Sequence, residues 1–457
     1  MTAIDTASLE RLLPAYLASR RWFRAKTRRV RQIRVRDVIQ LDGCFVISVL
    51  EIEYAQGDRD YYLLPLVSSE VSGFDEAALA SQDFRNALLA AIADSRTFHG
   101  RNGDLVASHT SAFEYTSAPL DSFISRAEQS NTSIIFRDRF ILKLFRKIEP
   151  GINPDLEIGH FLTQRGFRHT PALLGSLEYR PHGGGPSYAA GMLQQFVKNQ
   201  GDAWQYTLHS LEAGQPIGEY LPAAQLLGKR TAEMHAALAD SQDDPDFAPE
   251  PFTPAHAHRI YEETLAQADA VFELLRGKLS SLPEGAAESA RQVLAFENAI
   301  VNRFAGLKDL AVTNAVRIRY HGDFHLGQVL YTGDDFMIID FEGEPARPLA
   351  ERRARGLALR DVAGMLRSFQ YAAHAAADGR QSESREAVWN KRVSAAYLDA
   401  YFEQARNQLY IPAEKNQRQL LLDAFLLQKA VYEVAYELNN RPDWVNIPLR
   451  GILSLIG

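Results

Sequence analysis

A short segment from His321 to Asp340 combines the side chains that phosphoryl transfer requires. Asp323 supplies a carboxylate that can orient an attacking hydroxyl group and accept its proton. Gln328 and Asp340 supply oxygen atoms, which are the ligands that Mg²⁺ prefers. The segment therefore predicts a phosphoryl-transfer site with Asp323 as the base and with Gln328 and Asp340 as the metal ligands.

The spacing in this segment fits the general kinase template, in which an amide follows the catalytic aspartate by five residues. Gln328 stands where that template has asparagine, and its amide oxygen is an equivalent hard ligand. Two alternatives stay open. His321, Asp323 and His325 could cap a turn, or the two histidines could bind zinc with a third protein ligand, as in a zinc hydrolase.

A β-rich stretch upstream supplies groups suited to a nucleotide. Lys143 lies in an apolar run, where an unpaired ammonium group is costly, and Glu157 follows on the helix that Asn153 and Pro154 begin. A strand lysine and a helix glutamate are the pair that places nucleotide phosphates in kinases. The alternative is an edge lysine with a packed stem. A polar turn ahead of Lys143 is expected to cover the phosphates through Ser130, Asn131, Thr132 and Ser133.

The last long helix carries a polar and aromatic face suited to a sugar. Lys429, Tyr432, Glu433 and Tyr436 recur at three- and four-residue spacing, so they share one side of a helix. Charged groups can bind sugar hydroxyls, and aromatic rings can cover the C–H faces of a sugar. The alternative is a salt-bridged surface helix with half-buried tyrosines.

The elements around these residues predict an α+β chain in three parts: 1–90, 91–200 and 201–457. The first part reads as a small antiparallel sheet, with strands expected at 30–41, 44–54 and 61–67. The second contains the hairpin 132–136 and 140–145 and a helix from 153 to about 165. The third is mostly helical, with helices expected at 222–239, 254–275, 286–303, 357–377, 382–407 and 417–439.

Composition narrows the class of protein. The 457 residues have a net charge of −7, which argues against nucleic acid as the main partner. Nine of the seventeen residues from Arg20 to Arg36 are basic, but the apolar residues between them favour a strand with one wet face over a nucleic-acid arm. A single cysteine, Cys44, and the lack of a signal-like or membrane-length apolar run favour a protein of the cytoplasm.

Three strings carry a family resemblance: LPAYLASRRWFRAK near the start, NTSIIF…ILKLFRKIEPGINPDLEIGHFL in the middle, and HGDFHLGQVLY…IIDFEGEP. Together they resemble the maltokinases, in the aminoglycoside-phosphotransferase-like branch of the protein-kinase-like fold. The resemblance implies a bilobal kinase with an extra N-terminal cap, and ATP and Mg²⁺ as cofactors. It implies that His321 supports the catalytic loop, that Asp361 braces this loop, and that Gln195, Phe196 and Val197 receive adenine.

The C-terminal string KAVYEVAYELNNRPDWVNIPL also resembles the maltokinases, where this region lines the disaccharide site. By resemblance, Lys429, Tyr432, Glu433 and Tyr436 bind substrate, and the reaction is phosphorylation of maltose at its anomeric hydroxyl in carbohydrate metabolism. A trehalose-to-maltose isomerase is a plausible partner. The alternatives are a kinase of the same fold for glucosamine, another sugar or an aminoglycoside, and a silent sugar- or nucleotide-binding regulator. Glu342, Arg441 and Trp444 receive no role.

Overall fold

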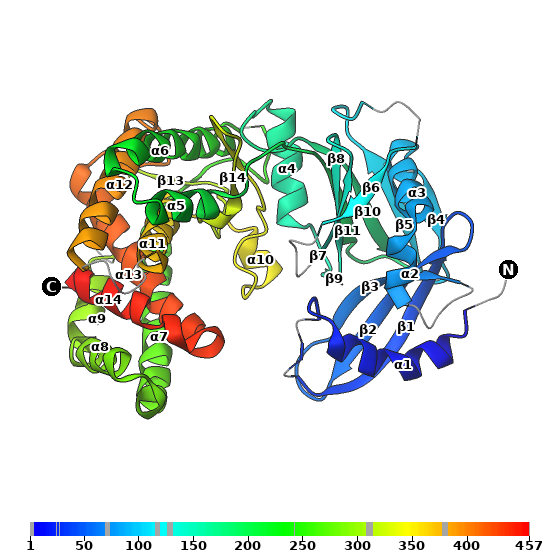
Figure 1. Ribbon diagram of the computed structural model, residues 1–457, viewed down its shortest axis with the longest axis horizontal. Coiled ribbons are helices and arrows are strands. Elements are labelled where there is room, and N and C mark those ends of the chain that lie inside the picture. The colour runs from blue at the N-terminus through cyan, green and yellow to red at the C-terminus, as the bar shows by residue number, and fades with distance from the viewer. Residues whose placement is uncertain are drawn as a thin grey trace. The chain divides into compact units, whose positions relative to one another are not determined.

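A computed structural model describes residues 4–23, 25–26, 28–68, 74–114, 119–125, 131–241, 243–307, 314–376 and 383–456 of the chain. It divides the chain into two compact units, Met1–Lys198 and Asn199–Gly457. Figure 1 shows that the first unit contains both large sheets and that the second is mainly helical. The predicted α+β class, with an antiparallel β-rich start, is confirmed.

The first sheet opens unit 1 and is antiparallel throughout. Its order is β1 (Val30–Gln40), β2 (Phe45–Tyr54), β3 (Asp60–Val67) and β9 (Lys147–Ile148). One face packs against α1 (Thr6–Ser19), which Asp5 caps by accepting a bond from the Ser8 backbone N–H. The other face joins the core that holds the second sheet. Because β2 is covered on both sides, nearly all its residues are buried.

The second sheet has seven strands in the order β4-β5-β10-β11-β8-β7-β6. Helices α2 (Phe74–Ala80), α3 (Gln82–Ala93) and α4 (Pro154–Gln164) belong to the same unit. The strands are β4 (Thr97–His99), β5 (Gly103–His109), β6 (Ser122–Ile124), β7 (Asn131–Phe136), β8 (Phe140–Phe145), β10 (Leu173–Pro181) and β11 (Tyr188–Gln195). Strand β8 lies between β11 and β7, so Lys143 is on an interior strand of the sheet.

Unit 2 is a set of packed helices around a short β-rich insert. The helices are α5 (Ala203–Glu212), α6 (Ile217–Ala239), α7 (Pro254–Lys278), α8 (Glu284–Ala295), α9 (Glu297–Ala305), α10 (Leu349–Arg352), α11 (Leu359–Ala375), α12 (Glu383–Gln404), α13 (Lys415–Asn440) and α14 (Asn446–Ile456). The insert comprises β13 (Val316–Arg317), which pairs with β12 (Glu250–Pro251), and the hairpin β14 (Val329–Tyr331) and β15 (Phe336–Ile338). This insert carries the predicted phosphoryl-transfer residues.

One predicted helix is divided in the structure. The expected helix 286–303 is two helices, α8 and α9, because Phe296 leaves helical geometry with ψ near 8°. Its backbone N–H donates to the carbonyls of Gln292 and Val293, which ends α8. The apolar periodicity continues through this break, so it does not reveal the bend.

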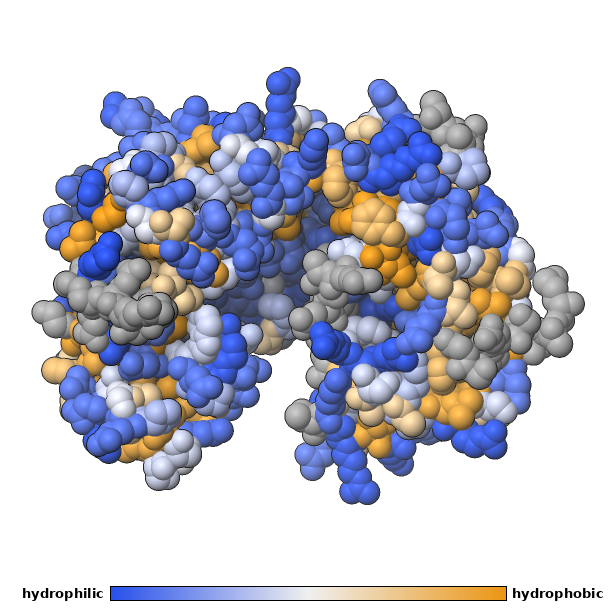
Figure 2. Space-filling view, in the orientation of Figure 1, coloured by the Kyte–Doolittle hydropathy of each residue, from blue (hydrophilic) through white to orange (hydrophobic). Residues whose placement is uncertain are grey.

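The visible surfaces of both units are mainly hydrophilic, with hydrophobic side chains scattered among them (Figure 2). Within the described residues, no helix combines the length and apolar character needed to cross a membrane.

Helix α6 lies against the backbone of α12 at Gly228, where an added Cβ would overlap the carbonyl oxygen of Tyr397. We therefore expect Gly228→Ala to lower the free energy of unfolding by about 1–3 kcal/mol, because the backbone contact leaves no room for a methyl group. Gly218→Ala is the matched control on the same helix, since its Cβ would meet no described atom within 4 Å. Urea unfolding of both variants measures the difference; equal stabilities would contradict the close contact.

Candidate active site

The ring of His321 connects the loop that carries Asp323 to the residue that follows β15. The buried His321 ring donates from Nε2 to the Ile339 carbonyl at 2.9 Å, and its Nδ1 accepts from the Asp323 N–H at 3.4 Å. These bonds define one tautomer and join the loop to the end of β15. With both ring nitrogens engaged, His321 is poorly placed as a zinc ligand.

Asp361, at the start of α11, anchors the same loop. Its buried carboxylate accepts the backbone N–H groups of His321 at 2.8 Å and of Gly322 at 2.9 Å. His235 of α6, also fully buried, donates from Nε2 to this carboxylate at 3.0 Å, and Tyr401 of α12 contacts the opposite nitrogen. Two helices and a loop therefore meet at one carboxylate, which is the bracing position that the resemblance implied for Asp361.

The hairpin β14–β15 brings the two predicted metal ligands to one end. Val329 pairs with Ile338, and the Ile339 N–H donates to the Gln328 carbonyl at 3.0 Å. Gln328 and Asp340 therefore flank the same end of the hairpin. Asp340 has φ of 69°, a left-handed conformation that is costly for a residue other than glycine and is often found at functional sites. An amide oxygen and a carboxylate placed in this way suit Mg²⁺.

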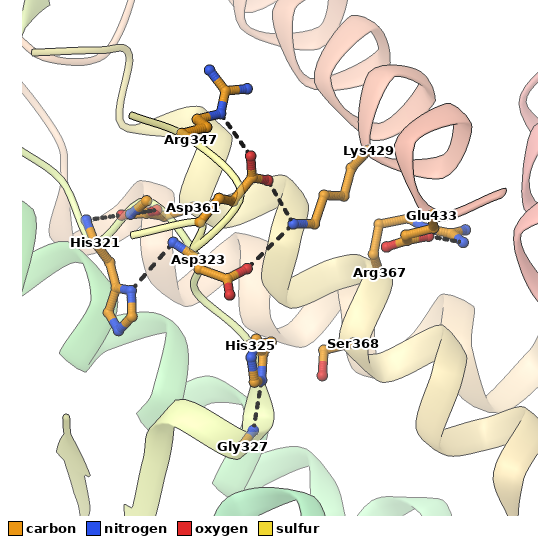
Figure 3. A network of polar contacts seen from close by, with 12 residues as sticks. His321, Asp323, His325, Gly327, Arg347, Asp361, Arg367, Ser368, Lys429 and Glu433 are labelled. Carbon is orange, nitrogen blue, oxygen red and sulfur yellow. Dashed lines mark hydrogen bonds and ion pairs between the residues drawn. The ribbon is translucent and has the colours of Figure 1, made fainter. Parts of the chain in front are cut away.

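Lys429 of α13 reaches the loop and connects it to a second carboxylate (Figure 3). Its Nζ lies 3.3 Å from Oδ1 of Asp323 and 3.0 Å from Oε1 of Glu344, and Arg347 donates to Glu344 at 2.7 Å. Burial alone would raise the pKa of Glu344, but the charges of Lys429 and Arg347 lower it to about 2. Burial lowers the pKa of Lys429, and Asp323 and Glu344 outweigh this effect and raise it. Both groups are thus charged at neutral pH.

The four side chains of the predicted sugar face of α13 have three different environments. Lys429 and Tyr432 line the same cavity as Asp323, with Nζ 5.0 Å from the centre of the Tyr432 ring. Glu433 instead turns to α11, where the buried Arg367 donates from Nε at 2.9 Å. Tyr436 is 45% exposed and stands apart from the lining of that cavity. Binding of substrate by these four residues stays a prediction.

Arg441 and Trp444, to which the sequence assigns no role, pack together just after α13. Arg441 forms an ion pair with the buried Glu437 and lies 4.8 Å from the centre of the Trp444 ring. Trp444 stacks against Tyr371 of α11 at 6.3 Å. These contacts fasten the helix end to its neighbour. Glu342 lies in the turn after Asp340, before the positive-φ Gly343.

In unit 1, Lys143 of β8 lies 3.5 Å from the carboxylate of Asp155, which the sequence argument did not name. Asp155 and Glu157 both belong to the first turn of α4, which begins at Asn153 and Pro154 as predicted. The pairing of Lys143 with Glu157 stays a prediction. Burial of Lys143 and Asp155 nevertheless matches the expectation that this ammonium group has an acidic partner.

The polar turn expected ahead of Lys143 is shorter than predicted. Asn131, Thr132 and Ser133 are in β7 and pair with Phe145, Leu144 and Lys143, so ladder bonds use their backbone groups. The Thr132 hydroxyl accepts from Arg146 at 2.8 Å. The strand predicted at 132–136 is confirmed and begins one residue earlier, at Asn131. The competing turn expectation was wrong for these three residues, because threonine and the following isoleucines favour a strand. Ser130 lies outside the described residues, and phosphate binding by this segment stays a prediction.

The expected adenine-binding residues follow β11. The backbone N–H of Gln195 donates to Ala172 and that of Phe196 donates to Arg139, both within unit 1. These bonds fix the direction of the chain as it leaves the sheet. Contact of Gln195, Phe196 and Val197 with adenine stays a prediction.

Sequence reasoning missed His235, Glu344, Arg347 and Arg367, which all lie in the polar network of unit 2. Glu344 stands in the quoted string IIDFEGEP, so its closeness to Asp340 was a usable signal. His235 sits 126 positions before Asp361 on a helix with an ordinary amphipathic pattern. Only its contact with Asp361 in the folded chain reveals it.

Comparison with known proteins gives two family matches. Residues 16–94 match the maltokinase N-terminal cap domain, and residues 124–343 match the phosphotransferase enzyme family. A glucosamine kinase of Streptacidiphilus jiangxiensis is 28% identical over 341 residues, covering 72% of each chain. A glucosamine kinase of Mycolicibacterium smegmatis is 25% identical over 339 residues, covering 72% of this chain and 78% of the relative.

The fold has a solved counterpart. The structure of a glucosamine kinase in complex with glucosamine, ADP and inorganic phosphate superposes with a TM-score of 0.72 over the whole of both chains, at 21% identity. This likeness establishes the fold of the chain.

The charged cluster at Glu344 predicts a pH dependence of stability. A carboxylate with a folded pKa of about 2 and an ordinary pKa of 4.5 stabilises the fold fully above pH 4.5 and progressively less as the pH falls toward 2. We expect Glu344→Gln to cost about 3 kcal/mol at pH 7, from the size of this pKa difference. Urea unfolding at pH 7, 5, 4 and 3 should show the gap to wild type narrowing only below pH 4.5.

Glu212→Gln, at an exposed glutamate of α5, is the control for loss of one carboxylate. We expect it to change the free energy of unfolding by less than about 0.5 kcal/mol at every pH. A Glu344→Gln effect that stayed constant down to pH 3 would show that charge pairing does not stabilise this cluster.

Proposed function

We propose that this chain, which matches the maltokinase N-terminal cap domain at 16–94 and the phosphotransferase enzyme family at 124–343, transfers the γ-phosphoryl group of ATP to a hydroxyl group of a small sugar. The single observation that carries this proposal is the position of Asp323. Its carboxylate lines a cavity together with Lys429 and Tyr432, on a loop that Asp361 braces. A base held in this way can meet a sugar hydroxyl in a fixed geometry.

In the proposed reaction the sugar oxygen attacks the γ-phosphorus in line. The new O–P bond forms as the bond from this phosphorus to the β,γ-bridging oxygen breaks, and ADP leaves. Asp323 orients the hydroxyl and takes its proton. Lys429 is close enough to donate to a sugar oxygen beside that hydroxyl.

Gln328 and Asp340 would hold Mg²⁺, which would neutralise charge on the phosphate oxygens when bound. The fit rests on the donors themselves, an amide oxygen and a carboxylate at one end of the β14–β15 hairpin. In the nucleotide half, Lys143 would place the phosphates, and Asp155 or Glu157 of α4 would position Lys143. The complex of a glucosamine kinase with ADP supports nucleotide use by this fold.

We favour maltose, phosphorylated at its anomeric hydroxyl to maltose 1-phosphate, as the acceptor. The match of residues 16–94 to the maltokinase cap supports this choice, as does the C-terminal string that contains Lys429 and Tyr432. Glucosamine is the second candidate, because the relatives at 28% and 25% identity bear that name. Use of ATP fits a protein of the cytoplasm, and an isomerase that supplies maltose is a plausible partner.

Asp323→Asn tests the role of the base. We expect kcat to fall by about 10²- to 10⁴-fold, because the amide cannot accept the hydroxyl proton, while ATP binding is retained. A coupled ADP-release assay with maltose, glucose, glucosamine and an aminoglycoside measures turnover, and calorimetry measures ATP binding. Asp334→Asn, at an exposed carboxylate of the β14–β15 turn, should keep wild-type turnover. Unchanged kcat in Asp323→Asn would refute the assigned role, and no turnover with maltose would refute maltose as acceptor.

A further inference from the structure

The cavity beside Asp323 is lined by equal numbers of cationic and acidic side chains, so it carries no net negative charge. Its acidic lining residues are Asp323, Glu344, Glu351 and Asp361, and its cationic ones are Arg347, Arg352, Arg360 and Lys429. A site that binds an ammonium group needs an excess of carboxylate to offset the lost hydration of the cation. This lining gives no such excess.

Each acidic group of the cavity is already engaged. Glu344 accepts from both Lys429 and Arg347, and Asp323 lies 3.3 Å from Lys429. Glu351 lies 3.7 Å from Arg347. Asp361 accepts two backbone N–H groups and His235. The ring of Tyr432, one of the aromatic side chains that line the cavity, already faces the Lys429 ammonium at 5.0 Å.

Lys429 places a positive charge next to the position of the reacting hydroxyl. Its ammonium lies beside the carboxylate that must receive the reacting hydroxyl, so every acceptor sugar comes within one pyranose ring of Nζ. Asp323 and Glu344 raise the pKa of Lys429 although burial alone would lower it, so the cation persists into alkaline solution. Two like charges in a partly buried site repel each other with little screening by salt.

We infer that Lys429 is a specificity-determining residue that admits neutral sugars and rejects protonated amino sugars. The inference rests on the proposed function and narrows its acceptor class to neutral sugars. The Lys429 ammonium already occupies the carboxylates of Asp323 and Glu344, with which the amine of an acceptor would have to pair. It can instead donate hydrogen bonds to the oxygens of a neutral sugar. The family match does not supply this distinction, since the relatives are glucosamine kinases.

Glucose and glucosamine differ at one position, where glucose has a hydroxyl group and protonated glucosamine has an ammonium group. Comparing them therefore measures the effect of the positive charge of the acceptor. We expect wild-type protein to favour glucose over glucosamine by at least roughly tenfold in kcat/KM near pH 6. The preference should shrink toward pH 9, because an amine of this kind loses its proton near pH ~8 whereas Lys429 stays charged. N-Acetylglucosamine, which is bulkier and neutral at every pH, separates size from charge, and maltose reports overall activity.

Lys429→Gln should reduce the glucose-to-glucosamine preference to near unity at pH 6, even where overall kcat falls. Lys429→Arg keeps the charge and should keep the preference, which a merely structural role of Lys429 would not predict. Calorimetric binding of each sugar to wild-type protein runs alongside turnover. The charge preference is therefore measured even if a variant fails to fold or no phosphate is transferred.

Wild-type protein that binds or phosphorylates glucosamine as well as glucose near pH 6 would overturn the inference. A preference that does not change with pH would also overturn it, because size rather than charge would then decide. Absence of phosphoryl transfer to every sugar, with the binding preference intact, would instead refute the proposed function and leave the charge selectivity standing.

Discussion

The geometry of the candidate site depends on one buried carboxylate. Asp361 receives two consecutive backbone N–H groups of the loop that carries Asp323, and His235 adds a third donor from α6. A buried carboxylate without partners would be costly, so these three bonds are required by the fold as well as by the loop. Gly364, one turn further along α11, permits the same approach, since an added Cβ would lie 2.6 Å from the Phe324 carbonyl oxygen. The position of the base is thus a property of the helical core.

A second set of charges connects this loop to α13. Lys429 spans Asp323 and Glu344, and Arg347 shares Glu344, so the segment after Asp340 is tied to the same helix. One helical turn away, Arg367 and Glu433 join α11 to α13. Ion pairs of this kind stabilise little when exposed, but here Arg367 is buried and the other partners are half-buried, so they hold one another in place. Lys429 and Glu433, on the face of α13 that is predicted to bind a sugar, therefore also hold α13 to the loop and to α11.

Much of the fold was predictable from local patterns. Strands β1, β2 and β3 of the first sheet, the hairpin of β7 and β8, and the start of α4 at Asn153 and Pro154 agree with their turn residues, alternation and capping signals. Strands β4 and β5 and helices α5 and α14 were missed, because short or ordinary segments gain their stability from packing. Asp323, Gln328 and Asp340 could be proposed from one string. His235 and Arg367 could not, since their partners are far away in the sequence.

The matches to known families leave the acceptor undetermined, and electrostatics can distinguish the candidates. Maltose and glucosamine both offer hydroxyl groups to Asp323, so the base does not choose between them. The charges around Asp323 can discriminate between the two acceptors, because Lys429 already pairs with the carboxylates of Asp323 and Glu344 that an amino sugar would need. The same cation stabilises two acidic groups that would repel each other without it. Selectivity and stability are therefore coupled at this residue, and a change of acceptor class would require new partners for Asp323 and Glu344 as well as the loss of one charge.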